Sequence, residues 1–441
     1  MSPPVDAVPD DGAVPAYANV VVIGGGVIGV CAAYFLAQKG LSVALVEKGR
    51  VAGEQSSRNW GWCRQQGRDE RELPLARESL RLWATLQREI GTDLGFRRTG
   101  VLFLTEEARQ QERWSEWAKM ARGYGVDTRV LGESQARDHT PGCTARWVGG
   151  IHTASDGRAE PAVAVPAIAR AARRQGVTIH QNCAVRGLET QGGEARWVVT
   201  EKGSIRADGV LCAAGAWSSL FCRRHGLDLP QLAVRSSVAR TGPADTITEG
   251  AIASSAFCIR KRLDGGYTVA LSEHNTLDLT PDAFRYFRAF LPAYRQERAH
   301  MKLRLNGRFL QAWRWPRTWN LDARTPFEEV RVLDPEPDVK ALRLALSNLR
   351  KAYPAVREIK AAESWAGMID VTPDALPVIS KARRLPGLTL ATGFSGHGFG
   401  IGPAAGRLAA DMVSAEAPIV DPSAFDYQRM TDGTKLIPQG L

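Results

Sequence analysis

The first fifty residues alternate between apolar runs of strand length and one helix-compatible stretch. Val20 to Ile23 is an apolar run that leads directly into closely spaced glycines, Val30 to Gln38 suits a helix, and a second apolar strand runs from Ser42 to Val46. Short apolar runs on either side of a helix-length segment are typical of a β-α-β unit in a parallel sheet. We therefore expect the chain to begin with an α/β domain.

The pattern changes twice further along the chain. Residues 232–353 contain alternating strands, such as Ala256 to Arg260 and Gly266 to Leu271, joined by a Leu-Asp-Gly-Gly turn, which indicates an antiparallel sheet. Buried apolar strands followed by glycine and a helix return at residues 209–220 and 388–412. We expect a discontinuous first domain of residues 18–95, 149–231 and 354–430, a second domain of residues 96–148 and 232–353, a mobile tail at 1–17 and a C-terminal tail at 431–441.

The glycines after the first strand have separate physical roles. Gly24 permits the tight turn, Gly26 lets backbone amides approach a pyrophosphate, and Gly29 lets the helix pack closely on the sheet. Glu47 ends the second strand about 20 residues further on, where an acid usually binds the ribose hydroxyls. The helix N-terminus would face the phosphates. Together these features predict an adenine dinucleotide site.

Charge and cysteine content narrow the class of protein. The formal net charge is +10, but Lys and Arg are spread along the chain without a basic block, so we expect no nucleic-acid partner. The seven cysteines are scattered and lack metal-site spacing, which predicts reduced thiols, no metal and a cytoplasmic location. Residues Met1 to Tyr17 lack the basic and apolar regions of a signal peptide, and no apolar run reads as a membrane span.

Two further loops carry ligand-binding features. The segment Gly53 to Gly67, GEQSSRNWGWCRQQG, offers small polar groups for a diphosphate and Trp60 and Trp62 as pocket walls, although a plain connecting loop is the alternative. Five glycines between Gly393 and Gly402 precede a helix that is entered through Pro403. Such a helix N-terminus stabilises negative charge on a bound group.

These motifs, in this order, resemble the FAD-dependent D-amino-acid oxidase family, which includes glycine oxidases, sarcosine oxidases and D-amino-acid dehydrogenases. The resemblance rests on VVVIGGGVIGVCAAYFLAQKGLSVALVEKG, SSRNWGW, GGIHTASDGRAEP, VLCAAGAWS, WAGMIDVTPDALPVIS and ATGFSGHGFGIGPAAGRLAADMV. It implies an α/β fold with a discontinuous Rossmann-like FAD-binding domain, and a substrate domain of mixed antiparallel sheet and helices that covers the flavin.

The resemblance also implies which residues contact FAD: the pyrophosphate by the first glycines, the ribose by Glu47, the adenine by the backbone of Val185, and the flavin edge by the late glycine loop. The full expected set is Gly24, Gly26, Val27, Ile28, Gly29, Glu47, Lys48, Ser56, Ser57, Arg58, Val185, Ala214, Gly215, Gly393, Gly396, Gly398, Phe399 and Gly400.

Residues at the reacting end are less well defined. His397, Gly398 and Phe399 are candidates at the flavin edge, and Arg64, Arg68 and Arg308 are candidates for binding a substrate carboxylate, although each arginine also fits an ordinary surface or structural role. No acid or base is nominated. FAD is expected to bind non-covalently because the tryptophan loop has no His and the C-terminal segment no Cys; Cys63 and His397 keep a covalent link as the alternative.

The implied reaction removes hydride from a carbon that bears an amine, with flavin N5 as the acceptor and an imine as the product. A D-amino acid, an N-methyl amino acid, a cyclic imino acid or another secondary amine fits as the substrate. Oxygen, a membrane quinone or a protein fits as the electron acceptor, so a location peripheral to the inner membrane and an oligomeric state both stay open. The alternatives are a flavoprotein subunit of a heteromeric amine dehydrogenase complex, a non-catalytic FAD-binding subunit, and a nicotinamide-dependent dehydrogenase.

Overall fold

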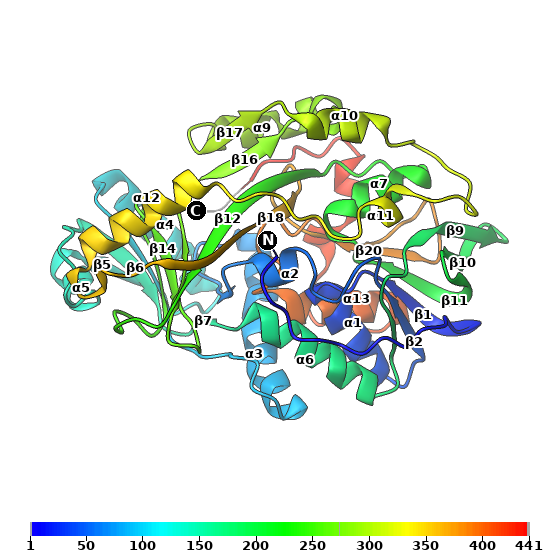
Figure 1. The fold of residues 1–441 in the computed structure, drawn as a ribbon, viewed down its shortest axis with the longest axis horizontal. Coiled ribbons are helices and arrows are strands. Elements are labelled where there is room, and N and C mark those ends of the chain that lie inside the picture. Colours follow the sequence, from blue (N-terminus) through cyan, green and yellow to red (C-terminus); the bar gives the residue numbers. More distant parts are fainter. Residues whose placement is uncertain (1, 273, 439–441) are drawn as a thin grey trace.

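Two sheets organise the structure, a computed structural model that describes residues 2–272 and 274–438 (Figure 1). The first sheet has the order β19-β20-β11-β1-β2-β8, with the hairpin of β9 and β10 added to β11. Its central pairs are parallel and β19 is antiparallel to β20. The strands are β1 (Tyr17–Ile23), β2 (Val43–Val46), β8 (Thr178–His180), β9 (Val185–Gln191), β10 (Glu194–Thr200), β11 (Gly203–Cys212), β19 (Val378–Lys381) and β20 (Leu388–Thr392).

One layer of helices covers this sheet. Helix α1 (Val27–Gln38) packs against α13 (Gly402–Ser414) and α6 (Pro161–Arg174), and α13 also packs against α3 (Leu73–Ile90). Ten of the twelve residues of α1 are buried, as expected for a helix that is apolar on every side. The β-α-β unit predicted from the sequence is therefore the centre of the molecule.

The second sheet has the order β17-β16-β12-β15-β14-β13-β4-β6-β5, and β18 pairs with β12. Helix α12 (Val339–Ala352) lies on it and buries an apolar stripe that includes Leu346 and Leu349. The strands are β4 (Val101–Thr105), β5 (Arg129–Gly132), β6 (Gly149–Thr153), β12 (Leu232–Thr241), β13 (Ala251–Ala253), β14 (Cys258–Lys261), β15 (Tyr267–Ala270), β16 (Asn275–Asp278), β17 (Met301–Arg304) and β18 (Ala361–Val371).

Shorter elements connect the sheets. Strands β3 (Trp62–Cys63) and β7 (Gly157–Arg158) form a two-stranded sheet of their own. The other helices are α2 (Gln55–Arg58), α4 (Ala108–Gly123), α5 (Glu133–Asp138), α7 (Ser218–Arg224), α8 (Pro281–Arg285), α9 (Phe287–Glu297), α10 (Gly307–Arg314) and α11 (Pro326–Glu329). Across the described ranges, no helix is long and apolar enough to cross a membrane.

Two strands lie in the second sheet although their segments were expected in the first domain. β6 pairs with β4 and β5, and β18 pairs with β12 through ten residue pairs. The apolar pattern predicts a strand at both places but carries no information about its partner, because sheet membership depends on distant parts of the chain. The domain boundaries remain a proposal, with β6 and β18 as the strands that cross between the two sheets.

The N-terminal segment differs from the mobile tail that was expected. The amide of Asp6 donates to the carbonyl of Ala162 (3.1 Å), the amide of Asp11 donates to the carbonyl of Ile179 (2.9 Å), and the Asp11 carboxylate pairs with Arg173. Residues 2–16 thus lie against α6 and β8. Proline-rich composition did not reveal these hydrogen bonds, which involve residues more than 150 positions away. Of the expected C-terminal tail, residues 439–441 lie outside the described residues.

Candidate active site

A continuous cavity runs along the carboxyl ends of the first sheet's strands. It consists of two hollows that share six lining residues, namely Gly26, Gln55, Ser56, Ala213, Gly215 and Asp370. The first hollow continues to Glu47, Val185 and Phe327, and the second to Gly396, Gly398 and Phe399. An extended ligand would therefore reach from the end of β2 to the late glycine loop.

The turn after β1 leaves room for phosphate. Gly24 has a φ of +111°, and a Cβ atom there would lie 2.4 Å from the carbonyl oxygen of Ala213. A Cβ atom on Gly29 would lie 2.0 Å from the carbonyl oxygen of Gly24, so this glycine serves helix packing rather than ligand contact. Gly26 is the N-cap of α1 and has no side chain to cap it, while Oγ of Ser56 accepts from the amide of Val27 at 2.8 Å. The dipole of α1 favours an anion at this end of the helix.

Glu47 is held rigidly at the end of β2. Its Oε2 accepts from the amide of Gly25 and its Oε1 from the amide of Gly49, both at 2.7 Å. Burial raises the pKa of Glu47, while the nearby Lys48 opposes this shift. Lys48 itself donates to Glu54 at 2.6 Å and lies 4.5 Å from the centre of the Trp217 ring. This end of the cavity combines a fixed carboxylate with aromatic walls, which suits a ribose and an adenine.

The late glycine loop is fixed by hydrogen bonds from two sides. Asp370 on β18 accepts from the amide of Gly393 at 2.8 Å, and burial raises the pKa of this carboxyl to about 6. The carbonyl oxygen of Gly400 accepts from Ser79 and from the indole of Trp83, each at 2.9 Å. Gly393 and Gly400 therefore position the loop, while Gly396, Gly398 and Phe399 line the cavity.

His397 belongs to a buried charged cluster behind this loop. Its Nδ1 lies 3.0 Å from Oε2 of Glu72, which is fully buried, and Nε of Arg68 lies 3.8 Å from the same oxygen. Burial, followed by the charge of Arg68, lowers the pKa of His397. Burial opposes ionisation of Glu72, but His397 and Arg68 outweigh it and lower the pKa of this carboxyl. Nδ1 of His397 also lies within hydrogen-bond distance of Oε1 of Glu72, at 3.2 Å.

Arg64 and Arg68 lie together in this cluster. Asp156 accepts from the amides of Gln65 and Gln66 at 2.8 and 3.1 Å and so fixes the loop that carries both arginines. Arg64 donates to the carbonyl of Gln66 and lies 5.3 Å from the centre of the Phe103 ring. Burial, and then the charge of Arg68, lowers the pKa of Arg64 to about 9. Nη1 of Arg68 is buried without a hydrogen-bond partner.

Arg308 lies apart from these two arginines. Its Nη1 is 3.3 Å from Sδ of Met368, a residue that lines the first hollow. Its charged neighbours are Asp278, Arg235 and Glu54, whereas those of Arg64 are Arg68, Asp156 and Glu72. The three arginines predicted as carboxylate partners are therefore divided between two places.

Arg58 and Ser57 do not reach the cavity, contrary to expectation. The Arg58 guanidinium donates to Asp334 at 2.7 Å and to the carbonyl of Ala366 at 2.8 Å, and Oγ of Ser57 donates to the carbonyl of Glu54 at 3.2 Å. Arg58 ties α2 to β18 instead. The direction of a long side chain is not encoded in the local pattern that suggested a pyrophosphate contact.

Most of the other expected FAD contacts line the cavity, whereas Gly29, Gly393 and Gly400 do not. Those that line one or both hollows are Gly24, Gly26, Val27, Ile28, Glu47, Lys48, Ser56, Val185, Ala214, Gly215, Gly396, Gly398 and Phe399. Cys63, the alternative for covalent attachment, is fully buried, and burial raises the pKa of its thiol well above the ordinary value.

Several lining residues were not expected as ligand contacts. Trp217 was read only as part of a helix, Gln55 stands next to the predicted serines, and Phe327, Met368 and Asp370 come from late segments. The position of Gln55 beside Ser56 was a usable signal. The sequence around Phe327 and Met368 carries no such signal, because only contacts between distant parts of the chain bring these residues to the cavity.

The cavity fits FAD by its own chemistry. It joins a glycine cradle at a helix N-terminus, a carboxylate held by two amides, and an apolar second hollow with a further helix N-terminus. Oε1 of Gln55, which lines both hollows, is buried without a hydrogen-bond partner. The fold and the site together define a protein that binds an extended dinucleotide beneath a second, largely antiparallel sheet.

The family described as "DAO: FAD dependent oxidoreductase" matches residues 19–412, and the chain belongs to this family. Its structure is similar to that of an L-amino acid deaminase from Proteus myxofaciens, with 30% identity and a TM-score of 0.94 over 98% of this chain and 97% of that one. Glycine oxidase of Pseudomonas aeruginosa is 27% identical over 92% of this chain and 98% of its own length. Human sarcosine dehydrogenase is 24% identical over 94% of this chain, which spans only 42% of that relative.

The chain is therefore an FAD-dependent oxidoreductase, as the sequence motifs predicted. Gly24, Gly26 and the α1 N-terminus would hold the pyrophosphate, Glu47 the ribose, and Gly396 to Phe399 the flavin end. FAD, when bound, accepts a hydride from the substrate. The residues of the chain contribute orientation, exclusion of water and, through the N-terminus of α13, a favourable potential for negative charge.

Proposed function

We propose that the chain oxidises the C–N bond of an α-amino acid whose carboxylate is bound by Arg64 and Arg68. The observation that carries this proposal is the pair of guanidinium groups beside His397, with Arg68 buried and Arg64 half-buried, and with Glu72 and Asp156 as nearby acids. Two like charges in one buried place repel each other, and an added carboxylate relieves that repulsion. The free Nη1 of Arg68 is a donor for such a group.

The amino acid proposed is of the L configuration. Support comes from the Proteus myxofaciens L-amino acid deaminase, which matches nearly the whole chain. Loss of hydride from the α-carbon gives an imine, and water converts it to a 2-oxo acid and ammonia. D-amino acids, N-methyl amino acids and cyclic imino acids are the competing substrates, and the sarcosine dehydrogenase relative supports an N-methyl amino acid.

The experiment that tests this proposal is an anaerobic visible spectrum of the FAD-loaded protein during addition of L- and D-amino acids, N-methyl amino acids and proline analogues. We expect bleaching of the flavin by L-amino acids. Bleaching by D or N-methyl substrates alone contradicts the L assignment. A flavin that none of these amines bleaches contradicts the whole proposal.

The arginine pair has its own test. Replacement Arg64→Gln removes one charged partner, so we expect KM for amino acids to rise about 30-fold, with a smaller change in kcat. The amide of the same amino acid, which lacks the carboxylate, serves as a control and should show no such loss. The matched variant Arg308→Gln tests the other site: if it raises KM and Arg64→Gln does not, the carboxylate is bound beside Met368 instead.

The electron acceptor and the assembly are part of the proposal too. Admission of air to the bleached protein distinguishes an oxidase, which recovers its colour at once, from a dehydrogenase that needs a quinone or protein acceptor. The alternative of a flavoprotein subunit in a larger amine dehydrogenase has support from the curated relatives, because the chain spans only 42% of human sarcosine dehydrogenase. Catalytic turnover by the isolated chain would contradict a non-catalytic subunit role.

A further inference from the structure

The two hollows of the cavity meet at a junction, defined here as the six residues that line both of them. Three of the six, Gln55, Ser56 and Asp370, carry a polar side chain. Oγ of Ser56 already accepts from the amide of Val27 at 2.8 Å. The side-chain groups that the junction can offer to a ligand are therefore mainly those of Gln55 and Asp370.

The carboxylate of Asp370 divides its oxygens between the protein and the cavity. Its Oδ2 accepts from the amide of Gly393 at 2.8 Å, and the amide of Phe394, Oγ1 of Thr392 and Nε2 of Gln231 lie 3.4, 3.4 and 3.5 Å from the same oxygen. All four donors, which belong to described residues, reach Oδ2 and not Oδ1. Asp370 is 7% exposed and lines both hollows, so we take Oδ1 as the oxygen on the cavity side.

Gln55 brings a carboxamide to the same junction from α2. Its Oε1 is buried and has no hydrogen-bond partner among the described residues. A Cβ atom on Gly367 would lie 2.0 Å from this oxygen, so the glycine on β18 makes the room that the carboxamide occupies. Rotation of a carboxamide exchanges its oxygen and its nitrogen, and a hydroxyl can pair with either one. Gln55 therefore suits a ligand that carries hydroxyl groups.

The charge of Asp370 limits what the junction can bind. Burial raises the pKa of this carboxyl to about 6, and the groups that oppose the shift are backbone amides and the hydroxyl of Thr392, none of which is a cation. A buried carboxylate without a cation repels a phosphate group, whereas neutral donors stabilise it. The ligand group at the junction should therefore be uncharged and should carry O–H or N–H donors.

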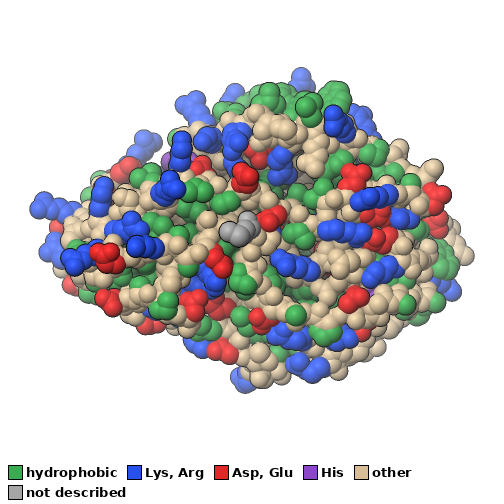
Figure 2. All heavy atoms as spheres, viewed as in Figure 1, with side chains coloured by type: hydrophobic (Ala, Val, Ile, Leu, Met, Phe, Trp, Pro, Cys, Tyr) green, Lys and Arg blue, Asp and Glu red, His purple; other side chains and the backbone are tan. Residues whose placement is uncertain are grey.

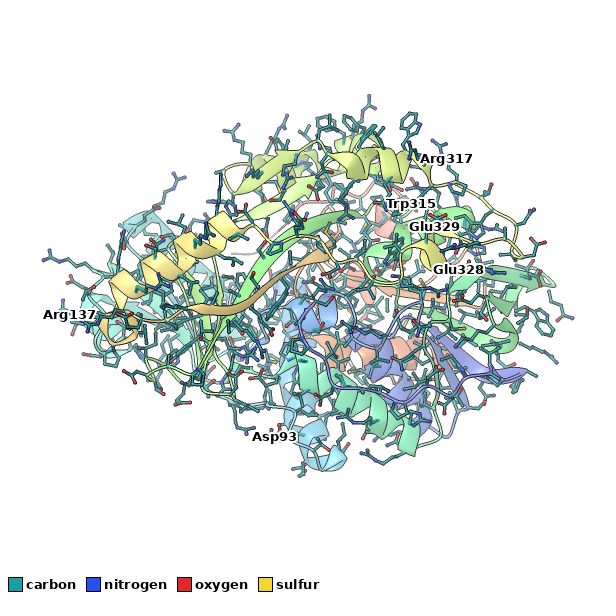
Figure 3. The ribbon with its side chains drawn as sticks, in the orientation of Figure 1. Asp93, Arg137, Trp315, Arg317, Glu328 and Glu329 are labelled. Atoms are coloured by element: carbon teal, nitrogen blue, oxygen red, sulfur yellow. The ribbon has the colours of Figure 1, made fainter. Side chains whose placement is uncertain are left out.

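Aromatic side chains close the first hollow from outside. Phe327 of α11 lines it, Trp217 packs on Phe327 at 5.7 Å, and Trp315 packs on Trp217 at 5.4 Å. Trp315 and Glu328, the neighbour of Phe327, mark this region in Figure 3. Charged side chains of both signs lie on the outer face (Figure 2), whereas aromatic rings form this inner wall. Hydrogen bonds behind such a wall are stronger than in water, because the local dielectric is lower.

We propose that the junction is a polyol subsite, in which Asp370 and Gln55 bind hydroxyls of the ribityl chain of FAD. The first hollow reaches Glu47 and the second reaches Phe399, so the part of FAD between its pyrophosphate and its ring system belongs at the junction. That part is an uncharged chain of hydroxyls, as the junction requires. The assignment does not rest on the proposed amino-acid oxidation, because FAD affinity is measured without substrate.

The test is titration of the full chain, freed of FAD, with FAD and with FAD analogues in which one ribityl hydroxyl is replaced by hydrogen. In Asp370→Asn the amide oxygen keeps the contact with Gly393, so a neutral NH2 group replaces the charged acceptor on the cavity side. We expect Kd for FAD to rise about 10-fold. This difference from the unchanged protein should vanish for the analogue that lacks the contacted hydroxyl. An unchanged Kd, or an equal loss for FAD and every analogue, overturns the proposal.

A second variant and a control keep the test decisive if Asp370→Asn folds poorly. Oε1 of Gln55 has no partner among the described residues, so Gln55→Leu should fold normally and raise Kd for FAD ~5-fold, again with no loss for one analogue. The matched control is Asp374→Asn, a buried carboxylate that pairs with Arg429 at 2.8 Å and lines neither hollow. It should change Kd for FAD and for all analogues by one common factor. The same behaviour in Gln55→Leu overturns its part in the subsite.

The pH dependence of FAD binding gives an independent readout. The ionised carboxylate is the better acceptor, so FAD affinity should fall as the pH decreases through about 6 and Asp370 takes up a proton. Asp370→Asn should show a smaller fall. The other charged side chains of the first hollow are the same in both proteins, namely Glu47, Lys48, Arg50 and Glu54. Equal pH dependence in the two proteins would mean that Asp370 does not contact the cofactor.

Discussion

His225 illustrates how burial at one residue sets a response to pH. Its Nε2 accepts from the amide of Leu188 at 3.2 Å, and its ring lies 5.1 Å from Phe221. Burial, with a contribution from Arg224, lowers the pKa of His225 to about 4 from an ordinary value of 6.5. The folded protein therefore keeps this imidazole neutral in a range where the unfolded chain already binds a proton.

Replacement His225→Gln should make stability less dependent on acid pH. Between pH 6.5 and 4 the unfolded chain gains a proton that the folded chain does not, so the free energy of unfolding falls as the pH falls. The full effect amounts to about 3.4 kcal/mol. Glutamine retains an acceptor for Leu188 but does not titrate. Thermal melts at pH 7.5 and pH 4.5 should differ less in the variant than in the unchanged protein.

Single residues also show the limit of inference from sequence. Gly24, Gly26 and Glu47 were predicted from local spacing and Val185 from the family resemblance, and all four line the cavity. Arg58 was misplaced because a long side chain can turn to either side of its loop. The buried contact between Glu72 and His397 had no local signal, since 325 positions separate the two residues.

At the scale of elements, helix α3 holds the late glycine loop. Its residues Ser79 and Trp83 both donate to the carbonyl oxygen of Gly400, and Trp83 also packs against Phe399 at 5.2 Å. The apolar residues of α3 recur at helical spacing, which predicts an amphipathic helix, and its apolar face is buried. Its role in fixing the flavin end of the cavity was not predicted.

Replacement Trp83→Phe should weaken both the fold and FAD binding. It removes the indole donor and leaves the Gly400 carbonyl short of one hydrogen bond, which costs about 1–3 kcal/mol in the free energy of unfolding. Trp147→Phe is the matched control, because its indole nitrogen is buried without a partner. Chemical denaturation and FAD titration should show a larger loss for Trp83→Phe. Equal losses would mean that volume, not the hydrogen bond, is responsible.

The sequence predicted the positions of elements that have a local apolar pattern. It did not predict which distant segments these elements pair with. The β-α-β unit appears where the apolar pattern placed it. The assignment of β6 and β18 to the second sheet and the docking of residues 2–16 escaped prediction, because each depends on pairing between segments far apart in the chain.

At the scale of the whole molecule, the cavity joins both sheets. Gly24 follows β1 of the first sheet, Met368 lies on β18 of the second, and Phe327 comes from α11 between them. A ligand that contacts all three resists separation of the two parts. The cofactor is thus expected to stabilise the second sheet as much as the first.

Removal of FAD should lower the stability of the whole chain. Free FAD at 100 times its Kd should raise the free energy of unfolding by about 2.7 kcal/mol relative to the apoprotein. Thermal melts followed by tryptophan fluorescence and by circular dichroism should shift together on FAD addition. A separate unfolding transition whose midpoint temperature does not change on FAD addition would show that the second sheet unfolds independently of the cavity.

The arrangement of the first sheet has a consequence for biosynthesis. β1 is synthesised long before its neighbour β11, and β11 in turn pairs with β20, which comes later still in the chain. Until β20 has been made, β1 and β2 lack a complete sheet and the cavity lacks its second wall. Strand edges of the nascent chain therefore stay unpaired during this part of synthesis, which favours association with chaperones. FAD is therefore expected to bind only after β20 has been synthesised.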